Sequence, residues 1–89
     1  MVKNRHFTRD KQLERWNRLA QKEKEVSRLL AEGKGVVEIT DAMESNRNYT
    51  RYRMRQVRWA LGLPDMPLVE FQREVREFMQ EAGLWEGEQ

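Results

Sequence analysis

The chain has 89 residues, of which 38% are hydrophobic and 36% charged, and its formal net charge is +2. This length allows one domain with a small core, and the absence of cysteine excludes disulfides and thiolate metal sites. No run of about 20 apolar residues could span a membrane and no signal-peptide pattern is present, so we expect a soluble, cytoplasmic protein.

The first segment, residues 1–7, is basic and lacks hydrophobic periodicity, which predicts a flexible arm. Basic side chains in such an arm can follow phosphates or enter a minor groove, and the alternative is a terminus without a function. The candidates here are Lys3, Arg5, His6, Arg9 and Lys11. His6 is the only histidine and has no cysteine or histidine partner, so no metal site is expected.

Thr8 is a favourable N-cap and predicts a helix that begins at Arg9. Apolar residues then recur at helical spacing as far as Leu30, with Trp16 on the apolar side and only polar residues around positions 21–25. This pattern fits either one long helix to Glu32 or two helices interrupted near positions 19–21. In both cases the following glycine, Gly33, ends the helical segment.

Two further helices follow, joined by three residues. A short apolar pattern predicts a helix over Val36–Met43, and Ser45 or Asn46 can cap the next one. That second helix is expected over Arg47–Leu61, with Gly62 as its end. A helix, a short turn and a basic helix form the outline of a helix-turn-helix motif.

The last helix is expected over 68–82, followed by a frayed acidic tail over 84–89. Its apolar side chains either pack within the chain or contact a second copy or another protein. The candidates for such a dimer or partner contact are Leu68, Phe71, Val75, Phe78 and Trp85. Because no strand-like alternation is present, the sequence predicts a single all-α domain of four to five helices over 8–83.

Charge is distributed unevenly along the chain. Residues 45–64 hold five arginines and no acidic residue, whereas residues 65–89 hold two basic and seven acidic residues. Arginines this close together repel one another, and a nucleic-acid backbone is a common polyanion that would neutralise them. The alternative is a basic helix face that only solvates the domain.

The stretch from Leu19 onward reads LAQKEKEVSRLLAEGKGVVEITDAM. This stretch resembles the LuxR-type DNA-binding domain. The residues that match the family pattern are Leu19, Glu23, Glu25, Val26, Leu29, Leu30, Ala31, Glu32, Gly33, Glu38 and Ile39. The resemblance covers Leu19–Leu63, about half of the chain, and region 4 of bacterial sigma factors shares the architecture. The Thr-Pro start of the family is Ala20-Gln21 here, which favours a continuous first helix.

The resemblance implies duplex DNA binding, with the N-terminal part of the basic helix in the major groove. Arginine can read guanine and asparagine can read adenine there. The candidate contacts are Arg47, Asn48, Arg51, Tyr52 and Arg55, with Arg58 on a phosphate. Of the remaining aromatic residues, we expect Trp59 to cover the packed edge of the last helix. The family also implies a dimer contact through that helix and an inverted-repeat site.

The first functional hypothesis is therefore a small transcriptional regulator that binds double-stranded DNA. The second is an interaction module on the same fold, such as an RNA polymerase-binding factor or an accessory subunit for DNA packaging or recombination. Catalysis is not expected, since Gly33-Lys34-Gly35 is too short for a P-loop and the chain has one histidine and no cysteine. No cofactor is expected either.

Overall fold

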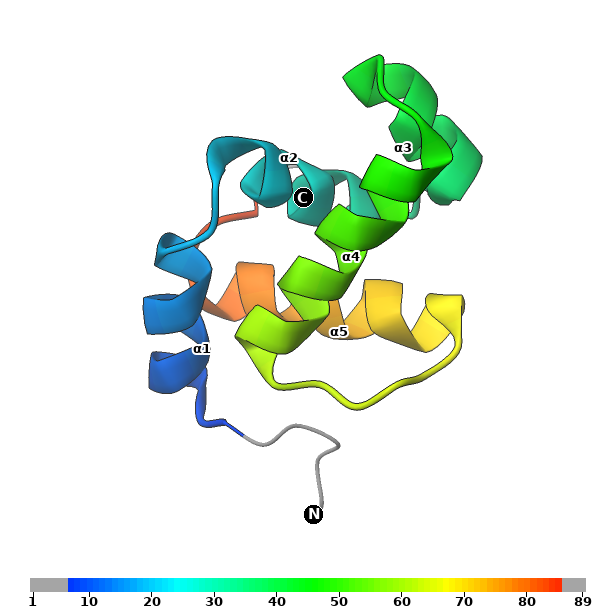
Figure 1. The fold of residues 1–89 in the computed structure, drawn as a ribbon. Coiled ribbons are helices and arrows are strands. Elements are labelled where there is room, and N and C mark those ends of the chain that lie inside the picture. The colour runs from blue at the N-terminus through cyan, green and yellow to red at the C-terminus, as the bar shows by residue number, and fades with distance from the viewer. Residues whose placement is uncertain (1–6, 86–89) are drawn as a thin grey trace.

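A computed structural model describes residues 7–85, and this part of the chain folds into five helices without a strand (Figure 1). They are α1 (Arg9–Asn17), α2 (Gln21–Ala31), α3 (Val36–Met43), α4 (Arg47–Leu61) and α5 (Leu68–Glu81). The expected all-α class is confirmed. The bounds of α3 and α4 are the ones predicted from the sequence.

The expected continuous first helix is wrong, because the chain leaves helical geometry between α1 and α2. Ala20 has an extended backbone, with φ −65° and ψ 157°, and a new helix starts at Gln21. Ala20 has no side-chain oxygen to cap this start. Instead, the Ala20 N–H donates to the Glu23 carboxylate at 3.0 Å, which is half of a capping box and supports the fresh start.

The other predicted helix ends are confirmed by their hydrogen bonds. The Lys11 N–H donates to Thr8 Oγ1 at 3.3 Å, and the Tyr49 N–H donates to Asn46 Oδ1 at 2.9 Å. Gly62, after α4, adopts the left-handed conformation with φ +65°. These caps depend on residues within four positions of each other, which is why the sequence could predict them.

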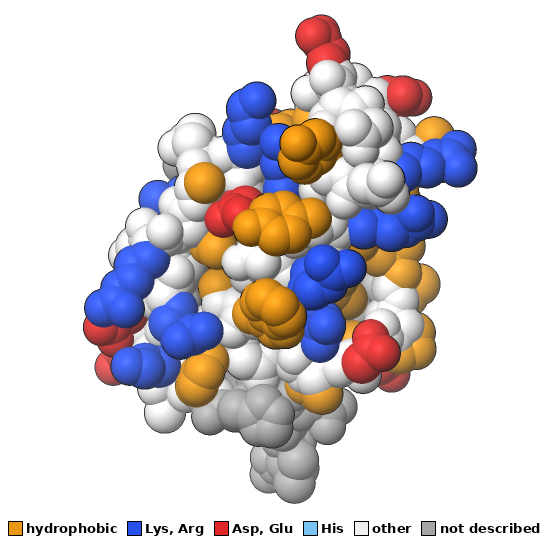
Figure 2. All heavy atoms as spheres, viewed as in Figure 1, with side chains coloured by type: hydrophobic (Ala, Val, Ile, Leu, Met, Phe, Trp, Pro, Cys, Tyr) orange, Lys and Arg blue, Asp and Glu red, His pale blue; other side chains and the backbone are white. Residues whose placement is uncertain are grey.

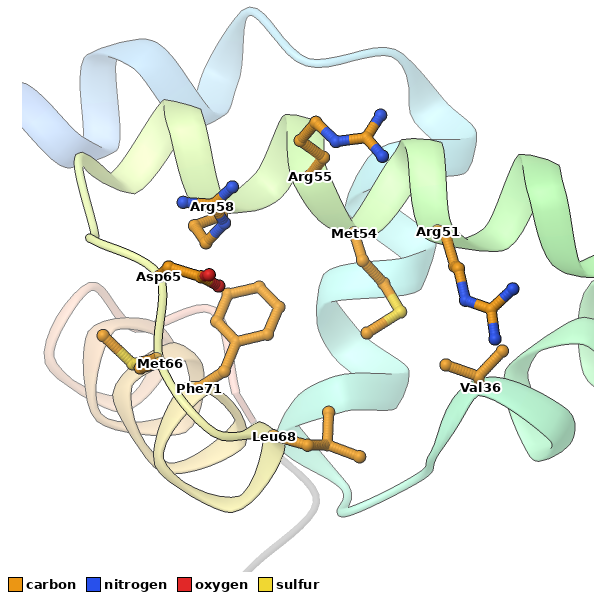
Figure 3. Close-up of a pocket in the computed structure, with 9 residues that line it drawn as sticks. All are labelled: Val36, Arg51, Met54, Arg55, Arg58, Asp65, Met66, Leu68 and Phe71. Carbon is orange, nitrogen blue, oxygen red and sulfur yellow. The ribbon is translucent and has the colours of Figure 1, made fainter.

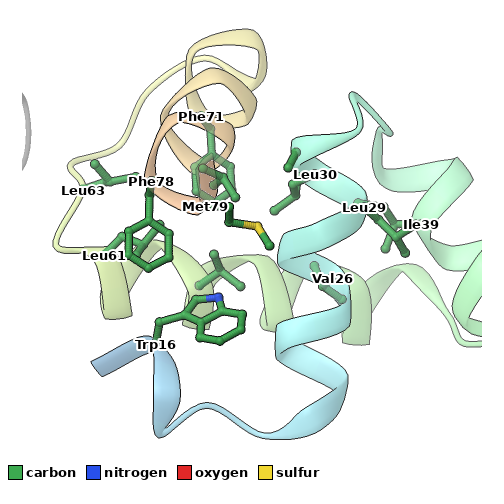
Figure 4. Close-up of a cluster of buried hydrophobic side chains, with 13 residues drawn as sticks. Trp16, Val26, Leu29, Leu30, Ile39, Leu61, Leu63, Phe71, Phe78 and Met79 are labelled. Atoms are coloured by element: carbon green, nitrogen blue, oxygen red, sulfur yellow. The ribbon is translucent and has the colours of Figure 1, made fainter. Parts of the chain in front are cut away.

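α2 packs against both α4 and α5, and the core lies between these three helices and α1 (Figure 4). The Trp16 ring enters this core from α1, where its Nε1–H donates to Ser27 Oγ at 3.1 Å. The buried hydrophobic cluster comprises Trp16, Val26, Leu29, Leu30, Ala31, Ile39, Val57, Leu61, Leu63, Phe71, Val75, Phe78 and Met79.

The expected dimer contact through α5 is wrong for three of its residues. Phe71, Val75 and Phe78 are at most 5% exposed, because their side chains fill the core of their own chain. Leu68 remains 38% exposed at the start of α5. Trp85 is half-buried against the core together with Leu84, so both belong to the folded domain rather than to a tail.

Candidate nucleic-acid interface

One face of α4 is fixed to the domain. Val57 and Leu61 are fully buried, and Thr50 is 1% exposed. The Thr50 hydroxyl lies 2.7 Å from the Thr40 hydroxyl, which joins the start of α4 to α3. α4 is therefore held in the domain by the buried side chains of Val57 and Leu61 in its second half, and near its start it is joined to α3 by one hydroxyl pair.

The other end of α4 is held by α1. Gln12 is 1% exposed, and its Nε2 donates to the carbonyl of Leu61 at 2.8 Å. Arg15 donates to the carbonyls of Trp59 and Ala60, both at 3.2 Å. These three carbonyls lie in the last turn of α4, where helix carbonyls lack a partner within the helix. A cation is also favourable at the negative end of the helix dipole.

The exposed face of α4 carries a straight row of side chains, which we call the central row: Asn48, Tyr52, Arg55 and Trp59. Their spacing of four, three and four residues places them on one side of the helix. Tyr52 is 47% exposed and Trp59 is 53% exposed. The expectation that Trp59 covers the packed edge of α5 is therefore wrong. Trp59 instead lines a depression together with Arg15 of α1, with Arg18, which follows α1, and with Glu23.

Cationic side chains lie on both sides of the central row. Arg51 and Arg58 line a groove on one side, whereas Arg15 and Arg18 line a shallow depression on the other. Figure 2 shows hydrophobic side chains in the middle of this face with blue Lys and Arg side chains to either side. The contribution of α1 was missed by the sequence analysis, because no local pattern shows that α1 lies beside α4.

No arginine of α4 takes part in an ion pair within residues 7–85. The ion pairs of this part of the chain lie on α1 and α2 and between α1 and α5. Arg28 illustrates the contrast. Its hydrogen bond to the Glu25 carboxylate raises the pKa of the Arg28 guanidinium, and Glu32 acts in the same direction. The arginines of α4 are thus not engaged in ion pairs within the described residues.

The groove beside α4 has a volume of about 290 Å³ and is lined by α4, the loop after it and the starts of α3 and α5 (Figure 3). Its basic wall consists of Arg51, Arg55 and Arg58, and Asp65 is its one carboxylate. Its apolar lining consists of Val36, Met54, Met66, Leu68 and Phe71. Arg58 is partly held in place, since it donates to the carbonyl of Leu63 at 3.5 Å.

A second hollow lies at the N-terminal end of α4 and is lined by Asn46, Asn48, Tyr49 and Tyr52. The Arg53 guanidinium lies 5.4 Å from the centre of the Tyr49 ring and also donates to Ser45 Oγ at 3.4 Å. Arg53 is half-buried, so this arginine positions its neighbours rather than extending the exposed basic face.

The candidates of the N-terminal arm separate into two groups. Lys3, Arg5 and His6 lie outside the described residues. Arg9 and Lys11 belong to α1 rather than to an arm. Each is paired within the domain, Arg9 with Glu81 at 2.5 Å and Lys11 with Glu14 at 3.6 Å. Their assignment to a phosphate-binding arm is therefore wrong.

Over residues 7–85, no helix is long and apolar enough to cross a membrane, and no group of three acidic or histidine side chains could hold a metal ion. Arg47, Arg51, Asn48, Tyr52 and Arg55 are all exposed on α4, so the structure brings these predicted residues together on one helix. Comparisons of the chain with protein-family models, with curated proteins and with solved structures found no match.

Proposed function

We propose that α4 is a recognition helix and that the protein binds double-stranded DNA as a small transcriptional regulator. The observation that carries this proposal is the exposed row of α4, together with α4 arginines that form no ion pair within residues 7–85. A buried opposite face and two anchored ends hold this row in a fixed position. A rigid helix with such arginines is suited to a polyanion, and the resemblance of residues 19–63 to LuxR-type domains supports duplex DNA.

The dimensions of the row support a major-groove ligand. From Asn48 to Trp59 the helix rises by about 16 Å, and the major groove, about 12 Å wide, admits one helix. Phosphates line both edges of that groove. Arg51 and Arg58, on one side of the central row, match one edge of the major groove. On the other side, Arg15 is bonded to the carbonyls of Trp59 and Ala60 and Arg18 pairs with Glu14 at 3.1 Å, so a phosphate at that edge would compete with these partners.

In this proposal each side chain of α4 contacts bases or phosphates according to its position on the helix. Asn48 and Arg55 lie in the central row and would contact base edges, as asparagine and arginine do with adenine and guanine. Arg47 and Arg51 lie toward the start of the helix and would contact bases or nearby phosphates. Arg58, which is half-buried and held by the Leu63 carbonyl, would contact a phosphate.

The test is fluorescence anisotropy on a random-sequence duplex titrated with salt. We expect log affinity to fall linearly with log salt, by about 0.9 per neutralised phosphate. The double variant Arg51→Glu, Arg55→Glu should lose at least roughly tenfold in affinity and lower the slope by about 1 for each phosphate that is no longer neutralised. The same charge change at Lys34 and Arg73, exposed outside α4, is the control.

Two outcomes would contradict the proposal. One is the absence of duplex binding at low salt. The other is an equal loss in the control variant Lys34→Glu, Arg73→Glu, which would reduce the effect to net charge. Circular dichroism of all variants establishes that the helices are retained.

The groove beside α4 favours a second candidate function, a protein-interaction module such as an RNA polymerase-binding factor. Three arginines next to Met54, Met66 and Leu68 resemble the mixture of arginine and apolar anchors that dominates protein interfaces. Leu68→Gln discriminates the two functions, because this exposed side chain lies at the rim of the groove and not in the central row, and the change leaves the charge of the groove unaltered. The substitution should abolish a protein contact and leave duplex affinity within about twofold.

A further inference from the structure

The hollow at the N-terminal end of α4 combines two kinds of surface. Tyr49 and Tyr52 provide aromatic rings that are 56% and 47% exposed, and Asn48, directly before Tyr49 in the sequence, provides an amide. The Asn48 side chain has no hydrogen-bond partner within residues 7–85 and is exposed. An amide that can both donate and accept therefore lies next to an apolar aromatic surface.

Two of the four side chains that line the hollow, Asn46 and Tyr49, have partners within the fold. The Asn46 side chain is occupied as the N-cap of α4, because its Oδ1 accepts the Tyr49 N–H. Arg53 lies over the Tyr49 ring and is itself bonded to Ser45. Of the two asparagines, only Asn48 thus has both its amide oxygen and its amide nitrogen without a partner within residues 7–85, and the Tyr49 ring lines the same hollow.

An A·T pair presents a matching pair of groups in the major groove. Adenine offers the N7 acceptor and the N6 donor, which an asparagine amide can bind together. Thymine offers the C5-methyl group, which is apolar and distinguishes it from every other base edge. A G·C pair offers no methyl group and a different order of donors and acceptors.

We infer that this hollow reads an A·T pair, with Asn48 on the adenine edge and the rings of Tyr49 and Tyr52 on the thymine methyl group. The inference rests on the proposed duplex binding and adds a base preference to it. Tyr52 acts here through its ring, so its hydroxyl is dispensable. Trp59, at the far end of the central row, lies outside the hollow and has no part in this preference.

The experiment uses hairpin duplexes with alternating A·T stems and chemically altered copies of them. Deoxyuridine in place of thymidine removes only the methyl groups. 7-Deazaadenine in place of adenine removes only the N7 acceptor. A hairpin with an alternating G·C stem serves as the comparison, and anisotropy is measured at one fixed salt concentration.

For the wild-type protein, we expect each buried methyl group to contribute about fourfold in affinity, so the deoxyuridine hairpin binds at least that much more weakly. Loss of the N7 acceptor should lower affinity by roughly fivefold or more. The A·T hairpin should be preferred to the G·C hairpin by a similar factor.

The variants assign these effects to the residues. Tyr52→Ala should remove most of the difference between thymine and uracil, whereas Tyr52→Phe should keep it. Asn48→Ala should remove the difference between adenine and 7-deazaadenine. Trp59→Ala, which also deletes an exposed aromatic side chain of α4, is the matched control and should leave both differences intact.

Equal binding of the thymine and uracil hairpins would overturn the inference while leaving duplex binding established. A thymine preference that survives in the Tyr49→Ala, Tyr52→Ala double variant would also overturn it. If no hairpin binds at low salt, the proposed function fails together with the inference.

Discussion

At the scale of single residues, the end of α4 places two side chains from a distant part of the sequence next to one glycine. Gly62 has φ +65°, and a Cβ atom placed there would overlap the ring of Phe7. The same ring also contacts Arg15, whose guanidinium lies 4.7 Å from the ring centre. Phe7, Arg15 and Gly62 therefore close the end of α4 as one unit.

This arrangement gives a prediction with an internal control. Gly62→Ala should destabilise the protein by about 1–2 kcal/mol for the left-handed backbone, and by a further 1–3 kcal/mol, approximately, for the overlap with Phe7. Gly33→Ala carries only the first cost, since Gly33 also has positive φ but no atom lies within 4 Å of its added Cβ. Urea unfolding measures both.

Whether the Phe7 ring causes the additional loss in Gly62→Ala is tested by making both glycine substitutions again in a Phe7→Ala variant. There, the free energies of unfolding lost in Gly62→Ala and Gly33→Ala should become similar. A gap that persists without the ring would show that Phe7 is not its cause.

At the scale of elements, the start of α2 lacks a side-chain acceptor at its N-cap. The N-cap residue Ala20 has the extended backbone of a capped helix but no side-chain acceptor. Glu23 supplies the one side-chain bond at this end. The weak cap also explains why the sequence analysis favoured a continuous helix, since the residue types here do not mark a helix start.

Ala20→Ser should therefore stabilise the protein by about 0.5–2 kcal/mol, because serine can accept the Glu23 N–H and complete the capping box. The gain is measured as a higher urea midpoint with an unchanged slope. Ala20→Val, which lacks an acceptor, serves as the control. A serine variant no more stable than the valine variant would mean that the interruption is set by packing alone.

At the scale of the whole molecule, the burial of α5 decides how stability depends on concentration. Phe71, Val75 and Phe78 serve the core of one chain, so these side chains are buried without a second copy. The unfolding midpoint should stay constant over about a hundredfold range of protein concentration. A midpoint that rises with concentration would reveal a dimer whose contact lies elsewhere, with exposed Leu68 and Val69 as the first residues to test.

The same burial predicts a large effect for one core substitution. Phe78→Ala should lower the free energy of unfolding by about 3–5 kcal/mol, because the ring is fully buried and packs near Trp16 at a centroid distance of 6.3 Å. A domain of this size has about 4–13 kcal/mol in total. The exposed residue Val69, changed to alanine, should lose less than about 1 kcal/mol. Similar losses in the two variants would contradict the assigned core.

Much of the candidate interface could be predicted from the sequence, but not the place of Trp59 in its central row. The arginines of α4 and Asn48 were identified from residue type and helix position. The exposure of Trp59 was not, because an indole beside a buried valine fits a packed position equally well. Arg15 and Arg18 were missed since they lie more than 40 positions from the α4 residues they border.

The sequence by itself determined the helical class, the bounds of α3 and α4 and most caps. Each of these depends on side chains within about one helical turn, where spacing and capping chemistry act directly. Only the tertiary structure decided that α1 holds the end of α4, that α5 serves the core and that one face of α4 remains open. Contacts such as Gln12 with Leu61, 49 positions apart, depend on how the helices pack, and local patterns carry no information about that packing.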